Sequence, residues 1–155
     1  MTALRAATLV IAILSLAACG HHEESRVVYR DGQSPVSFVD RGDPEMEAAI
    51  QTARDTLDQF IAELNKPGKR DFGIKAGIPT DDGTEHIWVS EIAYSNGVFR
   101  GLLANEPLNI PGKHEGDPVE VKREDVSDWF IVDGDETTGG FTTEVLMKRQ
   151  AVPQN

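Results

Sequence analysis

The chain has 155 residues and carries 15 basic against 26 acidic side chains, which gives a formal net charge of −11. A chain of this length suits one domain with a single hydrophobic core. The acidic balance repels nucleic acids and anionic lipid headgroups, so we expect no nucleic-acid partner. Solubility alone also explains such a charge, which therefore identifies no specific cationic partner.

The N-terminus combines a basic residue, Arg5, with an apolar run from Ala6 to Leu16. This run is well short of the ~20 residues that a membrane-spanning helix needs, and the pattern is typical of a secretory signal. The segment Leu16-Ala17-Ala18-Cys19 resembles the bacterial lipobox. In that signal the cysteine thiol receives a diacylglycerol, the chain is cut before the cysteine, and the new amino group is acylated, commonly with palmitate. The alternative is an ordinary secreted protein cut after Ala17.

Cys19 is the only cysteine of the chain and occupies the position that the lipobox requires. We therefore predict a signal peptide over residues 1–18 and a membrane anchor at lipidated Cys19. No thiol then remains for disulfides, zinc ligation or nucleophilic catalysis. Gly20 follows the cysteine, where enterobacterial lipoproteins kept at the inner membrane carry Asp, and this favours the outer membrane, facing the periplasm. Residues 19–42 are predicted to be a tether with a possible β-hairpin around Asp31-Gly32.

The clearest element is a helix beginning after Asp43, which is a good N-cap and is followed by proline at the first helical position. Apolar residues recur at helical spacing and form one stripe, which must cover another element. The helix is expected to end at Lys66-Pro67-Gly68. The stripe consists of Met46, Ala49, Ile50, Ala53, Leu57, Phe60, Ile61 and Leu64.

The rest of the chain alternates between β-prone runs and turns. Asn96-Gly97 is a strong hairpin signal, because both residues tolerate the positive φ of a type I′ turn. The predicted strands are 72–78, 85–94, 98–104, 119–122, 128–132 and 141–148. One helix followed by adjacent strands predicts an α+β fold, a single domain over 43–150 in which an amphipathic helix packs on an antiparallel, mostly meander sheet.

Several blocks appear in a characteristic order: "DPEMEAAI", "FGIKA", "EHIWV", "FRGLLANEP", "GDPVEV", "DW" and "GGFTTEVL". Together they closely resemble the bacterial domain of unknown function 2314, whose members include YegJ-type envelope lipoproteins. The resemblance covers roughly residues 43 to 147. It implies a domain and a family, and it brings no established activity, catalytic residue, cofactor or ligand.

The first candidate catalytic residue is His86. It could act as a general base, with the preceding Glu85 as the acid that orients it. Neighbours in a strand point to opposite faces, so these two side chains are not expected to meet. His86 is expected to share a face with Trp88. Asp117 and Asp128 are the acidic residues considered as its catalytic partners. The alternative is a structural histidine hydrogen-bonded to a neighbouring strand.

Two polar loops contain possible metal ligands. His114, Glu115 and Asp117 could join His86, but no zinc-type spacing supports them, and a turn is the favoured interpretation. The segment 133–140, "DGDETTGG", lacks the alternation of a calcium loop, so a hairpin turn is favoured there as well. We expect no metal and no cofactor.

Candidate ligand-binding residues are His86, Trp88, Asn105 and Trp129, since a partly exposed tryptophan on a sheet is a common ligand anchor. Both tryptophans are equally explained as core residues. The leading functional hypothesis is a lipid-anchored, non-enzymatic binding domain facing the periplasm, with an envelope protein or small ligand as partner. The rival hypothesis is a small hydrolase or metal-dependent enzyme that uses His86 with nearby acidic or histidine residues.

Overall fold

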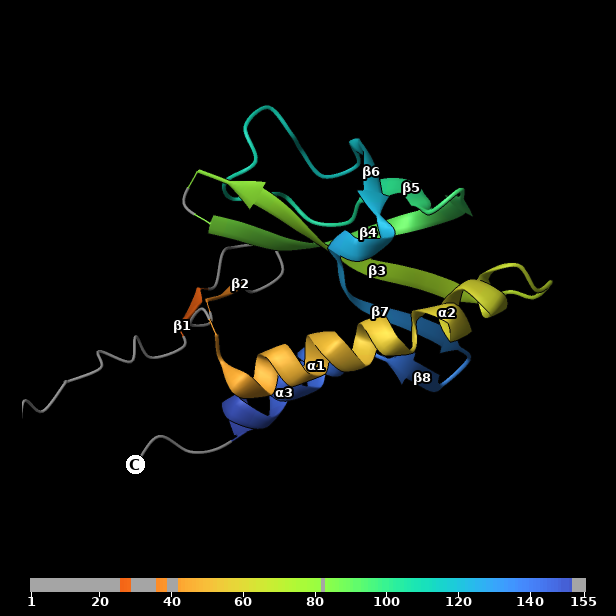
Figure 1. Ribbon diagram of the computed structural model, residues 1–155, viewed down its shortest axis with the longest axis horizontal. Coiled ribbons are helices and arrows are strands. Elements are labelled where there is room, and N and C mark those ends of the chain that lie inside the picture. Colours follow the sequence, from red (N-terminus) through yellow and green to blue (C-terminus); the bar gives the residue numbers. More distant parts are fainter. Residues whose placement is uncertain (1–25, 29–35, 39–41, 82, 152–155) are drawn as a thin grey trace, which may run out of the picture.

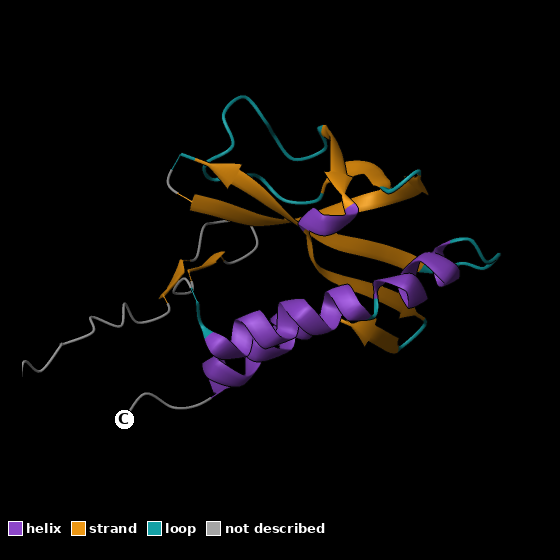
Figure 2. Cartoon of the chain, viewed as in Figure 1, coloured by secondary structure: helices purple, strands orange, loops and turns teal. Residues whose placement is uncertain are grey.

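The computed structural model describes residues 26–28, 36–38, 42–81 and 83–151. Cys19 and the predicted signal peptide lie outside the described residues. Two short strands, β1 (Arg26–Val28) and β2 (Val36–Phe38), pair antiparallel, which confirms the pairing expected around Asp31-Gly32. The remaining described residues form a six-stranded antiparallel sheet and three α-helices, so the α+β prediction is confirmed (Figures 1 and 2).

The predicted long helix is present as two segments, α1 (Pro44–Asp55) and α2 (Leu57–Leu64), which meet at Thr56. Asp43 caps α1 as expected, because its carboxylate accepts the backbone N–H groups of Glu45 and Met46. The break has a tertiary cause: the indole N–H of Trp129 donates to the Ala53 carbonyl at 3.0 Å. A side chain inserted into the helical ladder interrupts it.

The sheet has the strand order β6-β5-β4-β3-β7-β8. The strands β3 (Asp71–Thr80), β4 (Gly83–Ser95), β5 (Val98–Leu103) and β6 (Pro118–Lys122) form the predicted meander. The 3₁₀ turn η1 (Arg123–Asp125) then leads to β7 (Val126–Asp133), which pairs with β3. The β4–β5 turn confirms the hairpin prediction, with φ of 51° at Asn96 and 80° at Gly97.

The sheet must curl, because η1 alone joins strands that lie four positions apart in the sheet. Four steps of extended chain from Lys122 to Val126 reach at most ~14 Å, whereas four strand spacings of a flat sheet span ~19 Å. Phe60 of α2 packs on the concave side of this curled sheet. Its ring centroid lies 5.6 to 6.2 Å from those of Phe72, Phe99 and Trp129, which come from three different strands.

The sheet has two faces, a helix face and an outer face. The helix face carries the apolar core, with Ile74 on β3, Val89 on β4 and Trp129 on β7 paired side by side and no more than 1% exposed. The outer face carries the alternate residues. Near the middle of the three central strands its members include Gly73, Lys75, Gly77, His86, Trp88, Asp128 and Phe130.

The segment 141–148 was predicted as the last strand, and this is wrong. The chain forms β8 (Glu136–Gly139) where only a turn was expected, and then helix α3 (Phe141–Ala151), which packs against α1 (Figure 1). The N-terminus of α3 is capped by the Asp128 carboxylate of β7, which accepts the N–H groups of Phe141 at 3.1 Å and Thr142 at 2.9 Å. This cap is distant in sequence, so no local signal announced the helix.

Candidate functional site

The two glycines of "GIKAG" (73–77) shape the outer face. A side chain at Gly73 would collide with the Phe130 ring, its Cβ lying 2.3 Å from Phe130 Cε1. Because Gly73 leaves this space, the Phe130 ring crosses β3 and meets Trp88 on β4, with centroids 5.0 Å apart. Gly77 acts similarly, and His86 reaches over it to β7. The two glycines therefore let side chains from neighbouring strands close in on both sides of Lys75.

Lys75 lies between these two walls and is only 8% exposed. Its ammonium donates a hydrogen bond to the Thr142 hydroxyl at 2.7 Å and sits 4.6 Å from the centre of the Trp88 ring. The Thr142 hydroxyl in turn donates to the Asp128 carboxylate at 2.6 Å. Burial lowers the pKa of Lys75, and the negative charge of Asp128 opposes that shift. The hydroxyl thus links a buried cation to a buried anion.

His86 stands at the other wall and pairs with Ser127, at the β-bulge of β7, through a hydrogen bond of 2.8 Å between Nδ1 and Oγ. The Ser127 hydroxyl donates to the Lys75 carbonyl, so it receives the hydrogen bond from Nδ1–H. This arrangement leaves Nε2 with a free lone pair. The residue is exposed overall, but the Nδ1 edge is packed against β7, and this desolvation, followed by the charges of Lys75 and Arg54, lowers the pKa of His86.

The carboxylates considered as partners of His86 are engaged elsewhere. Asp117 accepts the backbone N–H of His114 at 2.9 Å inside the 105–117 loop, and Asp128 caps α3. Within the described residues the ring of His86 is hydrogen-bonded to Ser127, a hydroxyl that sequence inspection did not single out. The acid–base set proposed for the enzyme hypothesis is therefore not brought together around His86.

The 105–117 loop is built as a turn, as the sequence favoured. His114 Nδ1 contacts Glu106 Oε1 at 2.9 Å, and this hydrogen bond raises the pKa of His114. Asn105 is half-buried just after β5, at the start of the same loop. The described residues contain no group of three or more His, Cys, Asp or Glu side chains arranged to hold a metal ion.

The two tryptophans lie on opposite faces of the sheet. Trp129 is 1% exposed and belongs to the core, where its ring contacts Phe60 and Phe141. Trp88 is half-buried on the outer face beside His86 and Lys75. Of the four candidate ligand-binding residues, the structure therefore brings His86 and Trp88 together on one face and assigns Trp129 to the other.

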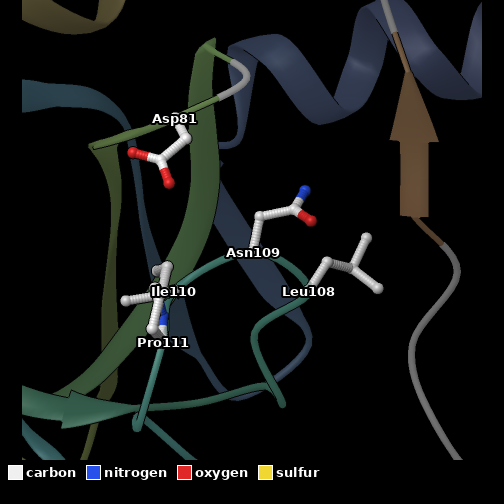
Figure 3. Close-up of a pocket in the computed structure, with 5 residues that line it drawn as sticks. All are labelled: Asp81, Leu108, Asn109, Ile110 and Pro111. Atoms are coloured by element: carbon white, nitrogen blue, oxygen red, sulfur yellow. The ribbon is translucent and has the colours of Figure 1, made fainter.

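Two open cavities lie away from this cluster. One of about 200 Å³ is lined by Arg54, Leu57, Arg123 and Glu124. The other, of about 280 Å³, lies between Asp81, in the β3–β4 connection, and the loop residues 108–111, which Figure 3 shows facing each other. That loop is held by the Glu85 carboxylate, which accepts the N–H groups of Leu108 and Asn109 at 2.8 Å each. Glu85 therefore anchors a loop and does not orient His86.

The comparison with known proteins fits this architecture. The sequence profile of a bacterial family described as "Uncharacterized protein conserved in bacteria (DUF2314)" matches residues 43–154, from the cap of α1 to beyond α3. The chain belongs to this family. The DUF2314 match covers every strand of the large sheet and both walls around Lys75.

Two relatives of this DUF2314 chain are informative. It is 32% identical to the protein YegJ of Escherichia coli K12 over 139 residues, which are 90% of this chain and 86% of that protein. It is 30% identical over 125 residues to a Neisseria meningitidis serogroup B protein named as an ankyrin repeat protein, of which it spans 49%. No solved structure matches the chain. Among the described residues, no helix has both the length and the apolar character that a membrane crossing requires.

Proposed function

We propose that the chain is a bacterial cell-envelope lipoprotein, anchored through Cys19 in the outer membrane, whose domain faces the periplasm and binds an envelope protein or a small ligand. The support for the anchor is the lipobox-like segment that ends in the only cysteine of the chain. The support for a binding role without catalysis is that the candidate carboxylates serve a helix cap and a loop turn instead of His86.

The observation that carries the binding proposal is that His86 and Trp88 lie on the face of β4 opposite to the core residues Ile87 and Val89. Helices α1 and α2 pack on the face of Ile87 and Val89, whereas His86 and Trp88 alternate with these residues on β4 and point to the outer face. A half-buried tryptophan beside an imidazole with a free lone pair offers both apolar contact and a hydrogen-bond acceptor, the combination typical of binding surfaces. The outer face of β3, β4 and β7 is therefore the proposed binding surface.

The anchor is tested by mass spectrometry of the mature N-terminus from the native membrane fraction. A triacylated peptide beginning at Cys19 is expected. The matched variant Cys19→Ser should lose the acyl groups and move to the aqueous phase on detergent partitioning. An unmodified peptide beginning at Ala18 would contradict the anchor, and it would leave the binding proposal to be tested on its own.

The binding surface is tested by photo-crosslinking in living cells from one position on each side of the domain. Ser90 lies on the outer face two residues after Trp88, and Gln59 is exposed on α2. A photoreactive amino acid at Ser90 should give a discrete adduct that the same group at Gln59 does not give. Identical adducts from both positions, or none from Ser90, would argue against a binding role for the outer face.

A further inference from the structure

We propose that Lys75 is a nucleophilic amine that captures small aldehydes as an imine on the outer face. No carbonyl-binding role follows from the resemblance or from the relatives. The inference deepens the proposed function by naming a ligand class for the same face. It is tested on purified protein, so its failure is distinguishable from failure of the crosslinking test.

Among the described residues, the Lys75 ammonium has an incomplete set of hydrogen-bond partners. A lysine ammonium has three N–H donors. In the part of the chain that the structure describes, one of them is taken by the Thr142 hydroxyl, and the Trp88 ring covers another side of the nitrogen. Asp128 is reached through Thr142, without a direct ion pair between Lys75 and Asp128. A buried cation that lacks a direct counter-ion gives up its proton more readily than an exposed one.

Within the described parts of the chain, Lys75 faces one negative group and one other titratable group on the elements packed against it. Asp128 on β7 is the negative group, and its carboxylate is shared with the N–H groups at the start of α3. His86 on β4 is the titratable group on the other side, and its positive form is disfavoured next to Lys75. Burial exceeds the attraction to Asp128 and lowers the pKa of Lys75. Desolvated lysines of this kind are the ones that act as imine-forming nucleophiles.

The surroundings of the Lys75 ammonium are largely apolar. The rings of Trp88 and Phe130 form an apolar wall beside the Lys75 ammonium, and Lys75 as a whole residue is 8% exposed. Apolar, largely buried surroundings of this kind disfavour a bulky or strongly hydrated ligand and favour a small, uncharged one. The single carbon substituent of an aldehyde fits these limits better than the two substituents of a ketone.

The reaction is balanced within the site and its ligand. The ammonium releases a proton to solvent, and the neutral Nζ attacks the carbonyl carbon to form a C–N bond. The nitrogen passes one of its two remaining protons through solvent to the carbonyl oxygen, and a carbinolamine forms. A proton from solvent converts that hydroxyl into the leaving water, and the resulting iminium nitrogen loses its last proton to solvent. The ammonium and the aldehyde together thus give a neutral C=N bond, one water and one proton. The Thr142 hydroxyl is placed to accept a hydrogen bond from Nζ and keep the amine oriented during these steps.

The experiment incubates the folded domain with propanal and traps imines with cyanoborohydride across a range of pH, with peptide mass spectrometry as the readout. Lys75 should be propylated several-fold faster at neutral pH than the exposed Lys122, and its rate should level off at a lower pH than that of Lys122. A Lys75 rate equal to or below the Lys122 rate at every pH overturns the proposal.

A variant pair guards against a purely structural explanation. Asp128→Asn removes the charge that opposes deprotonation, so Lys75 labelling at neutral pH should become faster while circular dichroism confirms the fold. The matched control Asp117→Asn, in the 105–117 loop, should leave the Lys75 rate unchanged. If Asp128→Asn disturbs the fold, Trp88→Phe, which keeps an aromatic wall, should retain fast labelling of Lys75. The proposal is overturned if Lys75 is labelled more slowly in folded Asp128→Asn than in the unmodified chain. It is also overturned if Lys75 in Trp88→Phe is labelled no faster than Lys122.

Discussion

The two faces of the central sheet are built from the same three strands and by opposite means. The helix face is filled by large apolar side chains around Phe60, which is fully buried. The outer face has glycine on both sides of Lys75 on β3, and its polar groups form two linked pairs, Lys75 with Thr142 and His86 with Ser127. The comparison teaches that packing for stability and placement of chemistry are divided between the faces, with each strand serving both.

The helix face should carry most of the stability. Phe60→Ala removes the ring that joins three strands to α2, and we expect a loss of about 3–5 kcal/mol in the free energy of unfolding. Urea denaturation followed by circular dichroism measures it. The neighbouring exposed substitution Gln59→Ala should stay within about 0.5 kcal/mol of the unmodified chain. A Phe60→Ala chain as stable as the Gln59→Ala chain would remove the basis of the comparison.

The loss of stability on replacing Gly73 or Gly77 by alanine should depend on how closely a neighbouring ring lies over the glycine. Gly73→Ala places its Cβ against the Phe130 ring and should destabilise the domain by about 1–3 kcal/mol through overpacking. Gly77→Ala meets His86 and Thr84 only at 3.3 Å and should have a smaller effect. Denaturation of both variants gives the order. If Gly77→Ala proves the more damaging, the outer-face arrangement described here is incorrect.

The α1–α3 clamp, formed by Arg149 with Asp43 and Glu45, should contribute less to stability than the helix face. Arg149 contacts Asp43 Oδ1 at 2.8 Å, and this hydrogen bond is the main reason that the pKa of Asp43 falls to about 2. Asp43→Ala should lose about 1 kcal/mol as a missing N-cap.

The pH dependence of this clamp has a defined sign. A depressed pKa gives stability that is fully present above the unfolded-state value of 3.8 and is lost as the pH falls toward 2. The unmodified chain should therefore lose more stability between about pH 4 and about pH 2 than Asp43→Ala does. Parallel profiles for the two chains would show that the cap does not titrate in this way.

The smallest effect is expected in the exposed 105–117 loop, which belongs to neither face. The Glu106 carboxylate raises the pKa of His114, so its stabilisation is fully present below the unfolded-state pKa and is lost as the pH rises through the folded value. His114→Gln should flatten this part of the stability profile and leave labelling of Lys75 unchanged. A measurable change at Lys75 would mean that the loop and the outer face are coupled.

Local patterns were sufficient for much of the fold. Asp43 and the apolar stripe predicted the first helix, and Asn96-Gly97 predicted the β4–β5 turn. The error at 141–148 has a physical reason: β-branched residues favour a strand locally, but the Asp128 carboxylate, 13 residues earlier, caps the segment as a helix. Tertiary contacts of this kind leave no signature in the segment itself.

The site was less predictable than the fold. Strand alternation correctly placed His86 and Trp88 on one face, but it could not show that His86 pairs with Ser127 across β3. The signal that was available is the spacing of "GIKAG", because glycines on either side of Lys75 on one strand face allow side chains to cross. Trp129 was ambiguous from sequence because burial of a tryptophan depends on which face the helices cover.

The most direct test of the division between the faces is the yield of the Ser90 photo-adduct in a Trp88→Leu chain, normalised to the amount of folded protein. Leucine keeps the position apolar, so the fold is expected to persist while the aromatic surface is lost. The account predicts that the adduct disappears. An undiminished adduct would contradict the assignment of binding to the outer face.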